Sequence, residues 1–193
     1  MNSHEEEVLN LFHQTGALLQ GHFILRSGLH SREFFQCALL LRDTQATERI
    51  CGFIADQYRS LDFDTVISPA LGGLVVGQEV ARQLGKPHIF VEKDSEGTLV
   101  LRRGFTIQTG ERFLVIEDVV TRGGRLMETV EIVRQHRGVV ASAATVVDRS
   151  GGKLPPMDFP FHGLLEFEPK TFSPDQLPPD LAGTPGSKPG STP

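Results

Sequence analysis

Short apolar runs alternate with segments of helical spacing along the middle of the chain. The apolar runs begin near residues 65, 88, 113 and 139, and helical spacing follows at 74–84 and 126–135. The run at 113–116 is apolar at every position, as expected of a parallel strand that is covered on both faces. This alternation predicts an α/β fold, in which a mostly parallel twisted sheet is flanked by helices.

The two ends of the chain predict further elements. Residues 3–14 present one apolar face and predict a first helix, and Asp43 is placed to cap a helix over residues 44–58. Residues 21–31 and 33–38 indicate two short strands joined by a glycine turn, and residues 162–167 indicate a last strand.

Length and composition indicate one domain with a flexible end. The chain has 193 residues, of which 39% are hydrophobic and 22% charged, and this suffices for one ordinary globular core. Residues 173–193 hold six of the 12 prolines and no aromatic residue, which is typical of a flexible segment. We therefore expect a single domain over residues 1–172 and a flexible Pro/Gly-rich tail over residues 173–193.

Charge and targeting features exclude several classes of protein. The net charge of −5 argues against a general nucleic-acid-binding protein. No apolar stretch approaches the length of a membrane span, and the acidic residues 3–7 do not resemble a signal peptide. We expect a cytoplasmic protein that binds neither nucleic acid nor membranes. Cys37 and Cys51 lack metal-ligand spacing, and we expect them to be buried free thiols.

The strongest chemical pattern lies where the run at 113–119 ends. Glu117-Asp118 is followed by Val120-Thr121-Arg122-Gly123-Gly124-Arg125, a glycine-bearing turn that leads into a helix. Backbone amides and the helix dipole favour a phosphate there, Thr121 adds a hydroxyl, and the two carboxylates can accept hydrogen bonds from ribose hydroxyls. Because neighbouring strand residues point to opposite faces, we expect at most one acid on each side of the sheet. The alternative is a plain helix entry with two solvated acids.

Two further places along the chain offer groups for anions. Ser68-Pro69-Ala70-Leu71-Gly72-Gly73 joins a strand to a helix and presents small residues and free amides, although such a loop can also be without a ligand. Lys93 ends a strand, and Arg102-Arg103 ends a hairpin arm, where solvated charges are the alternative. Arg149 leaves a core strand and suits a planar carboxylate, unless it pairs with Asp148 or another neighbour.

The ordered string of Glu117-Asp118, two valines, Thr121 and Gly123-Gly124 after an apolar strand closely resembles the signature of the type I phosphoribosyltransferases. In that family the loop binds the ribose 5-phosphate of phosphoribosyl pyrophosphate (PRPP). The resemblance implies the corresponding fold, with a small hood over the active site from residues of about 16–42 and 155–172.

Three more segments resemble one branch of this family, the orotate phosphoribosyltransferases. They are the pattern Phe23-x-Leu25-Arg26-Ser27-Gly28-x-x-Ser31-x-x-Phe34-Phe35, the pair Asp148-Arg149, and Glu92-Lys93 followed by a glycine and Leu101-Arg102-Arg103-Gly104-Phe105. The last of these resembles a bacterial variant with a short lid. The likeness covers nearly everything except the tail.

The resemblance implies an enzyme that transfers the 5-phosphoribosyl group from PRPP to orotate. The products would be orotidine 5′-monophosphate and pyrophosphate, in the de novo synthesis of pyrimidines (UMP). It also implies Mg²⁺ as cofactor, bound mainly through substrate and without direct protein ligands. A cytoplasmic homodimer is implied, in which the lid is shared between subunits.

The resemblance also assigns residues. It implies that Asp118, Glu117 and Lys93 are catalytic. For orotate it implies contacts from Phe34, Phe35, Thr121 and Arg149. For PRPP it implies contacts from Arg26, Lys93, Arg102, Arg103, Glu117, Asp118, Val119, Val120, Thr121, Arg122, Gly123, Gly124, Arg125, Ala70, Leu71 and Gly72.

The chain departs from the family pattern at several positions. Arg122 and Arg125 stand where small hydroxyl residues or alanine are more common, and Gly72 stands near the position of a frequent lysine. Glu92 replaces an arginine, and no histidine lies between Lys93 and Gln135 to match the family's lid histidine.

Two other functions fit the same motif. One is transfer to another base, purine or uracil, but Arg26 and Arg149 suit an acidic base. The other is a regulator that senses PRPP without chemistry. Such regulators usually carry a nucleic-acid-binding element or a basic face, and the sequence has neither.

Overall fold

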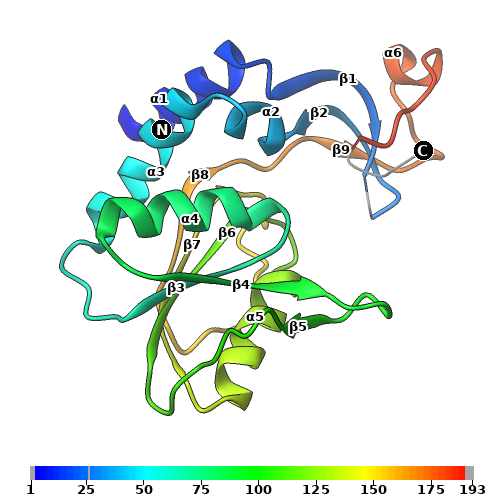
Figure 1. The fold of residues 1–193 in the computed structure, drawn as a ribbon. Coiled ribbons are helices and arrows are strands. Elements are labelled where there is room, and N and C mark those ends of the chain that lie inside the picture. Colours follow the sequence, from blue (N-terminus) through cyan, green and yellow to red (C-terminus); the bar gives the residue numbers. More distant parts are fainter. Residues whose placement is uncertain (1–2, 26, 190–193) are drawn as a thin grey trace.

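A six-stranded sheet forms the centre of the computed structural model, which describes residues 3–25 and 27–189 (Figure 1). The strand order is β5-β4-β3-β6-β7-β8, and every neighbouring pair is parallel except β4 and β5. The predicted fold class, a mostly parallel sheet flanked by helices, is confirmed. The carboxyl ends of the parallel strands therefore meet at one edge, which is where open α/β sheets bind ligands.

The elements follow one another as α1 (Ser3–Gln14), β1 (Leu18–Ile24), β2 (His30–Phe35), α2 (Cys37–Leu41), α3 (Thr44–Tyr58), β3 (Thr65–Pro69), α4 (Gly72–Leu84), β4 (His88–Lys93), β5 (Leu99–Leu101), β6 (Arg112–Val120), α5 (Gly124–Gln135), β7 (Val139–Asp148), β8 (Phe161–Glu166), β9 (Thr171–Phe172) and α6 (Pro179–Ala182). The four predicted core strands correspond to β3, β4, β6 and β7. Helix α4 begins at Gly72, earlier than the predicted residue 74. Within residues 3–25 and 27–189, none of the helices has the length and apolarity needed to cross a membrane.

Strand β6 explains why the sequence shows no alternation there. Leu114 and Ile116 face the side covered by α1, α3 and α4, whereas Phe113 and Val115 face the side covered by α5, and all four side chains are fully buried (Figure 1). Burial of each such side chain stabilises the fold by about 1.5–3 kcal/mol relative to exposure. A strand covered on both faces is apolar at every position.

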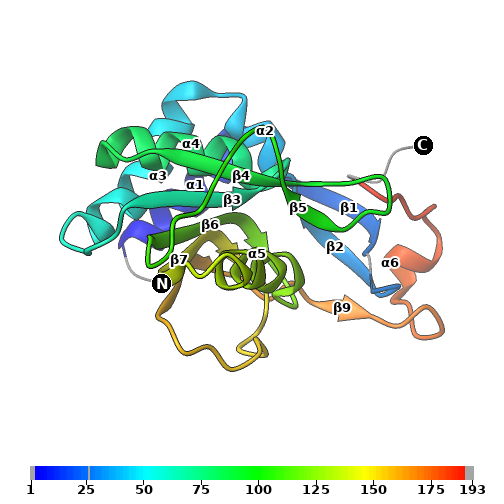
Figure 2. The ribbon, with the colours of Figure 1, turned by 60° about the horizontal axis from the view of Figure 1, so that its bottom comes forward.

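The hood sheet consists of β1, β2 and β9 and lies beside the central sheet (Figures 1 and 2). Its anchor is Phe35, whose ring lies 4.8 Å from the rings of Phe12 and Phe167. Of the predicted hood range 155–172, β9 pairs with β2, whereas Phe159 packs in the cluster on the α5 side.

The segment after β9 folds back onto the hood sheet. Residues 173–189 include α6, and Leu181 of that helix is buried. We expected a flexible tail over residues 173–193, and residues 190–193 lie outside the described part of the chain. The division of the chain at residues 172 and 173 stays a prediction.

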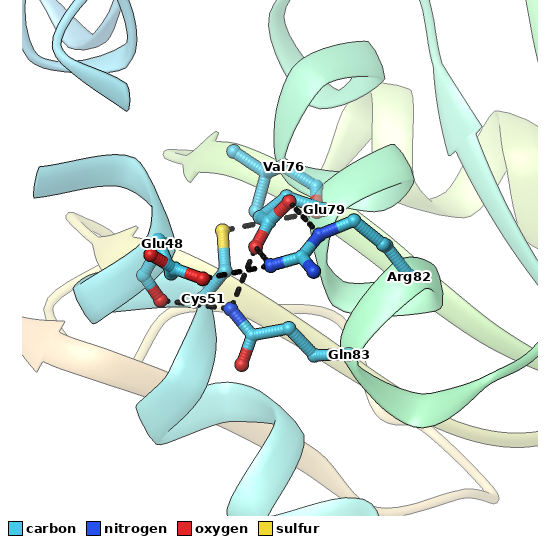
Figure 3. A network of polar contacts seen from close by, with 6 residues as sticks. All are labelled: Glu48, Cys51, Val76, Glu79, Arg82 and Gln83. Carbon is cyan, nitrogen blue, oxygen red and sulfur yellow. Dashed lines mark hydrogen bonds and ion pairs between the residues drawn. The ribbon is translucent and has the colours of Figure 1, made fainter. Parts of the chain in front are cut away.

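A polar network joins α3 to α4 on the outer side of the sheet (Figure 3). Arg82 donates to both oxygens of Glu79, at 2.7 and 2.8 Å, and to Glu48 of α3 at 2.9 Å. Gln83 donates to the carbonyl oxygen of Glu48 and to Glu79, each at 2.8 Å. Its bond to the Glu48 carbonyl and the Arg82 bond to the Glu48 side chain both connect α3 to α4.

We expect Glu79→Gln to weaken this connection between α3 and α4. The hydrogen bond from Arg82 lowers the pKa of Glu79, so its stabilising effect is present above the unfolded carboxyl pKa and is lost as pH falls through the lower folded value. Because the Arg82 side chain is 56% exposed, solvent screens the pair, and the free energy of unfolding should fall by only about 0.5 kcal/mol at pH 7. Urea denaturation at pH 7 and pH 3 measures this, and the difference between the two proteins should be smaller at pH 3 than at pH 7.

Asp56→Asn is the matched control, because among the described residues Asp56 accepts only from Arg59, the C-cap of the same helix. An equal loss of stability in both variants, or a loss in Glu79→Gln that is as large at pH 3 as at pH 7, contradicts a connection between the helices.

Candidate active site

Two carboxylates at the end of β6 lie against the start of α4. A Cβ at Gly72 would sit only 2.6 Å from Oδ1 of Asp118, and a Cβ at Gly73 would sit 3.3 Å from Oε1 of Glu117. Real Cβ atoms do not approach other atoms as closely as 2.6 Å, so position 72 admits only glycine while Asp118 keeps this place. Both carboxylates thus lie close to the start of α4, and the expectation of at most one acid on each side of the sheet stays a prediction.

The two acids share one buried environment. Burial raises the pKa of Glu117 well above its usual range, and the Asp118 charge raises it further. Burial also raises the pKa of Asp118, although hydrogen bonds from Glu117 and from its neighbouring amides oppose this shift. Oδ1 of Asp118 accepts from the Val119 amide at 2.8 Å. Glu117 is therefore the acid that holds a proton most readily, and Asp118 is the one that carries the charge.

The turn after β6 presents backbone amides without acceptors. Gly123 has φ of 76°, a left-handed conformation that glycine adopts without strain, and it turns the chain into α5. Among the described residues, the amides of residues 121–126 donate no hydrogen bond, and the Met127 amide is the first that does, to the Gly123 carbonyl at 2.8 Å. Thr121 and Arg122 are exposed. We name residues 120–125 the phosphate loop, because amides at a helix N-terminus suit an anion.

A second loop offers amides at the same edge. The Ala70 amide donates to Val91 at 2.7 Å, but those of Leu71, Gly72 and Gly73 donate no hydrogen bond to the described residues. The peptide bond between Ala70 and Leu71 is cis, and the Leu71 side chain is 84% exposed. The starts of α4 and α5 thus both present free amides beside Asp118.

Arg149 reaches the site from the end of β7. Its amide donates to the Val120 carbonyl at 2.8 Å, which fixes it beside the phosphate loop. Its Nε is buried and has no hydrogen-bond partner among the described residues. Burial lowers the pKa of the guanidinium, although an arginine remains charged at neutral pH. A buried donor without a partner is costly, and a planar carboxylate would satisfy it.

The two neighbouring phenylalanines of β2 have different surroundings. The guanidinium carbon of Arg149 lies 6.0 Å from the ring centre of Phe34. The ring of Phe35 is 3% exposed and packs between Phe12 and Phe167, so it cannot form a platform for a ligand. A role of Phe35 in binding is limited to its backbone. Arg26, the third hood residue assigned to a ligand, lies outside the described residues.

The basic residues of the β4–β5 hairpin divide into two groups. Lys93 is exposed at the carboxyl end of β4, and the side chains of Lys93 and Arg102 make no hydrogen bond or ion pair with the described residues. Arg103 instead donates to Glu92 at 2.7 Å, and its guanidinium lies 5.8 Å from the ring of Phe90. The structure thus gives Arg103 a carboxylate partner, whereas Lys93 and Arg102 can meet an anion.

The two arginines of the phosphate loop also differ. Arg125 pairs with Glu128 one turn later and donates to the Gly97 carbonyl at 3.5 Å, which connects α5 to the β4–β5 hairpin. Arg122 is exposed, and its side chain makes no hydrogen bond or ion pair with the described residues. Val120 is buried and Val119 half-buried, so their side chains belong to the core rather than to the loop.

The sequence did not indicate two residues that the structure brings to the site. Cys37 is a buried free thiol, as expected, but it also lies beside Asp118 and Arg149; burial raises its pKa, Asp118 raises it further, and Arg149 lowers it. Thr145 of β7 donates to the Asp118 carbonyl at 3.0 Å and holds the end of β6 in place. For Cys37, the local sign in the sequence was its position directly after Phe34-Phe35-Gln36.

Comparisons with known proteins agree with this geometry. Residues 40–172 match the phosphoribosyl transferase domain family. An orotate phosphoribosyltransferase of Caldicellulosiruptor bescii is 44% identical over 187 residues, covering 97% of each chain. One of Chlorobaculum parvum is 48% identical over 185 residues, covering 96% of this chain and 95% of the relative.

Solved structures share the fold. An orotate phosphoribosyltransferase of Aeropyrum pernix superposes with a TM-score of 0.71 at 24% identity, covering 82% of this chain and 93% of its own. An adenine phosphoribosyltransferase of Thermoanaerobacter pseudethanolicus superposes with a TM-score of 0.62 at 18% identity, covering 70% of this chain and 88% of its own.

We expect Glu117→Gln to make the protein more stable at alkaline pH. The folded-state pKa of Glu117 is raised, so stability is fully present below the unfolded pKa and is lost as pH rises through the folded value. A glutamine mimics the protonated acid and removes that loss. Urea denaturation should show a free energy of unfolding about 1 kcal/mol higher than in the parent protein at pH 8, and equal to it at pH 4.

Glu131→Gln serves as control, because Glu131 is exposed on α5 and should give no difference at either pH. A Glu117→Gln protein that is less stable than the parent at pH 8 would show that the ionised acid is well satisfied in the folded state.

Proposed function

The chain belongs to the orotate phosphoribosyltransferase family, and we propose from this premise how its sheet edge performs the family's reaction. The enzyme transfers the 5-phosphoribosyl group of PRPP to orotate, which gives orotidine 5′-monophosphate and pyrophosphate in pyrimidine synthesis. One observation supports the residue roles most directly: the free amides of residues 121–126 adjoin a buried pair of carboxylates.

The ribose 5-phosphate group binds at the end of β6. Its phosphate accepts hydrogen bonds from the amides of the phosphate loop and from the Thr121 hydroxyl, at the positive end of the α5 dipole. The ribose hydroxyls donate to Asp118 and Glu117. Both carboxylates are held beside Gly72 and Gly73, so they are in place before the substrate arrives.

Orotate binds between β7 and the hood sheet. Its carboxylate accepts from the buried Nε of Arg149, which has no other partner among the described residues, and its ring lies near Phe34. A guanidinium presents parallel N–H groups that match a carboxylate, and neutral bases lack this group. Arg149 therefore supports orotate over purine or uracil as the acceptor.

The departing pyrophosphate lies over the second loop. The amides of Leu71, Gly72 and Gly73 hold it, and Lys93 and Arg102 approach from the β4–β5 hairpin at the same sheet edge. Breaking the C1–O bond leaves positive charge on the ribose and negative charge on the pyrophosphate. Asp118 stabilises the first and the basic residues the second, so no covalent nucleophile is required.

Mg²⁺ is the proposed cofactor. As the family resemblance implies, the ion would be bound mainly through oxygens of the substrate, which suit Mg²⁺, and not by direct protein ligands. The described residues contain no group of three or more His, Cys, Asp or Glu that could hold a metal ion. When bound, the ion would neutralise charge on the pyrophosphate.

We place the enzyme in the cytoplasm and as a homodimer. Among the described residues both cysteines are free thiols, which persist in a reducing compartment. Leu71 is 84% exposed and Val75 41% exposed, one turn apart at the start of α4, and exposed apolar side chains next to a site suit a second subunit. The β4–β5 hairpin is then the lid that the subunits share.

The reaction is tested by the absorbance of the base. Orotate should lose its absorbance when PRPP and Mg²⁺ are added with the enzyme, while adenine, hypoxanthine and uracil should not be consumed. If another base were consumed at a comparable rate, that base and not orotate would be the acceptor. If no base were consumed, the protein would be a regulator that senses PRPP without chemistry.

We expect Arg149→Ala to weaken orotate binding selectively. A hydrogen bond to a charged group is worth about 1.5–3 kcal/mol, so the KM for orotate should rise by about 30-fold, while the KM for PRPP changes by less than about threefold. Arg149→Lys keeps the charge but loses the forked donor geometry, so its KM for orotate should lie between those of the parent enzyme and Arg149→Ala. Steady-state kinetics with each substrate varied in turn measures both constants, and equal effects on both would remove Arg149 from the orotate site.

A further inference from the structure

Residues 173–189, here named the C-terminal clasp, run from one edge of the hood sheet to the other. β9 pairs with β2 through His30–Phe172 and Ser31–Thr171 and forms one edge of that sheet. The chain then crosses to the other side, where Ser187 forms a parallel bridge with Phe23 of β1 (Figure 2). The clasp therefore covers the outer edge of β1, which would otherwise present unpaired backbone groups.

An ion pair fixes the middle of the clasp. Both guanidinium nitrogens Nε and Nη2 of Arg32 donate to the carboxylate of Asp180 in α6, at 2.6 and 2.7 Å. The Arg32 guanidinium also lies 4.7 Å from the ring of Phe172. A bidentate pair has a defined geometry, so it fixes both the position and the orientation of α6 on β2.

A chain of hydrogen bonds fixes the end of the clasp. Nδ1 of His22 donates to the Thr184 carbonyl at 2.6 Å, and Nε2 of the same ring shares a hydrogen bond with Nδ1 of His30 at 2.5 Å. The Ile24 amide donates to the Ser187 carbonyl at 2.7 Å, and the Ser187 amide donates to the His22 carbonyl at 2.9 Å. His22 is buried, and it thereby joins β1, β2 and the clasp.

Two further contacts connect the clasp to Phe34 and Arg149, the residues proposed to bind orotate. The ring of Phe23, whose backbone pairs with Ser187, lies 5.9 Å from the ring of Phe34. Phe34 in turn lies 6.0 Å from the guanidinium of Arg149. No such contacts run from the clasp to the phosphate loop within the described residues. A shift of the clasp would thus move the surroundings of Arg149 and leave the phosphate loop in place.

We propose that the C-terminal clasp is a positioning element for orotate, in which Asp180 and Ser187 hold β1 and β2 so that Phe34 stays against Arg149. The proposal rests on the function proposed above and adds residues to it. Neither the clasp nor the hood strands β1 and β2 fall within residues 40–172, the part that matches the general phosphoribosyl transferase domain. This agrees with a role in binding one base rather than in binding PRPP.

Two variants test the clasp at separate points. Asp180→Arg places a like charge against Arg32, and Ser187→Pro removes the amide that donates to His22. Each should raise the KM for orotate by about fivefold, while the KM for PRPP and kcat stay within about twofold of the parent enzyme. The double variant Arg32→Asp/Asp180→Arg should restore the KM for orotate, because it rebuilds the pair with its charges exchanged.

Asp175→Arg is the matched control, since Asp175 lies in the same clasp, is exposed and makes no hydrogen bond or ion pair with the described residues. It should leave both KM values unchanged. The inference is overturned if the variants raise both KM values equally, or if they lower the melting temperature without changing either. A parent enzyme that consumes no orotate would instead overturn the proposed function, and the clasp's role with it.

Discussion

Backbone amides without an acceptor are the constraint on which this structure depends. A helix leaves its first amides without intrahelical partners, and burying such groups away from water costs free energy. In this chain the amides of residues 71–73 and 121–126, at the starts of α4 and α5, donate no hydrogen bond to the described residues. No serine, threonine or aspartate side chain caps either helix, whereas Asp43 caps α3 with two hydrogen bonds. The two helices at the site thus keep open the positions that an anion can fill.

The carboxylates at the same edge of the sheet also cost the fold free energy. Glu117 and the half-buried Asp118 lie side by side, and burial raises the pKa of both. Nearby, Arg149 keeps a buried Nε without a partner among the described residues. A core selected for stability alone would not place these groups together. In the proposed complex, ribose hydroxyls and an acidic base would supply the missing partners of these groups.

Local patterns predicted the sheet and the phosphate loop from the sequence. The unbroken apolar run at 113–116 and the glycines after Thr121 act over a few residues, so periodicity and turn chemistry suffice for them. The features that sequence reasoning missed depend on distant contacts. The convergence of Glu117 and Asp118 depends on glycines at the start of α4, and the core position of Phe35 on Phe12 and Phe167. The ion pair between Arg32 and Asp180 joins residues 148 positions apart, and the composition of the tail gave no sign of it.

The central claim is that the amides after β6 and the acids Glu117 and Asp118 hold the ribose 5-phosphate group. Titration of the ¹⁵N-labelled protein with ribose 5-phosphate, followed by amide chemical shifts, tests it most directly. The account predicts saturable shifts that are largest at residues 121–126, with smaller shifts at Asp118 and Val119, and their loss when ribose without phosphate is used. Shifts confined to the β4–β5 hairpin or the hood sheet, with the amides of residues 121–126 unchanged, would contradict it.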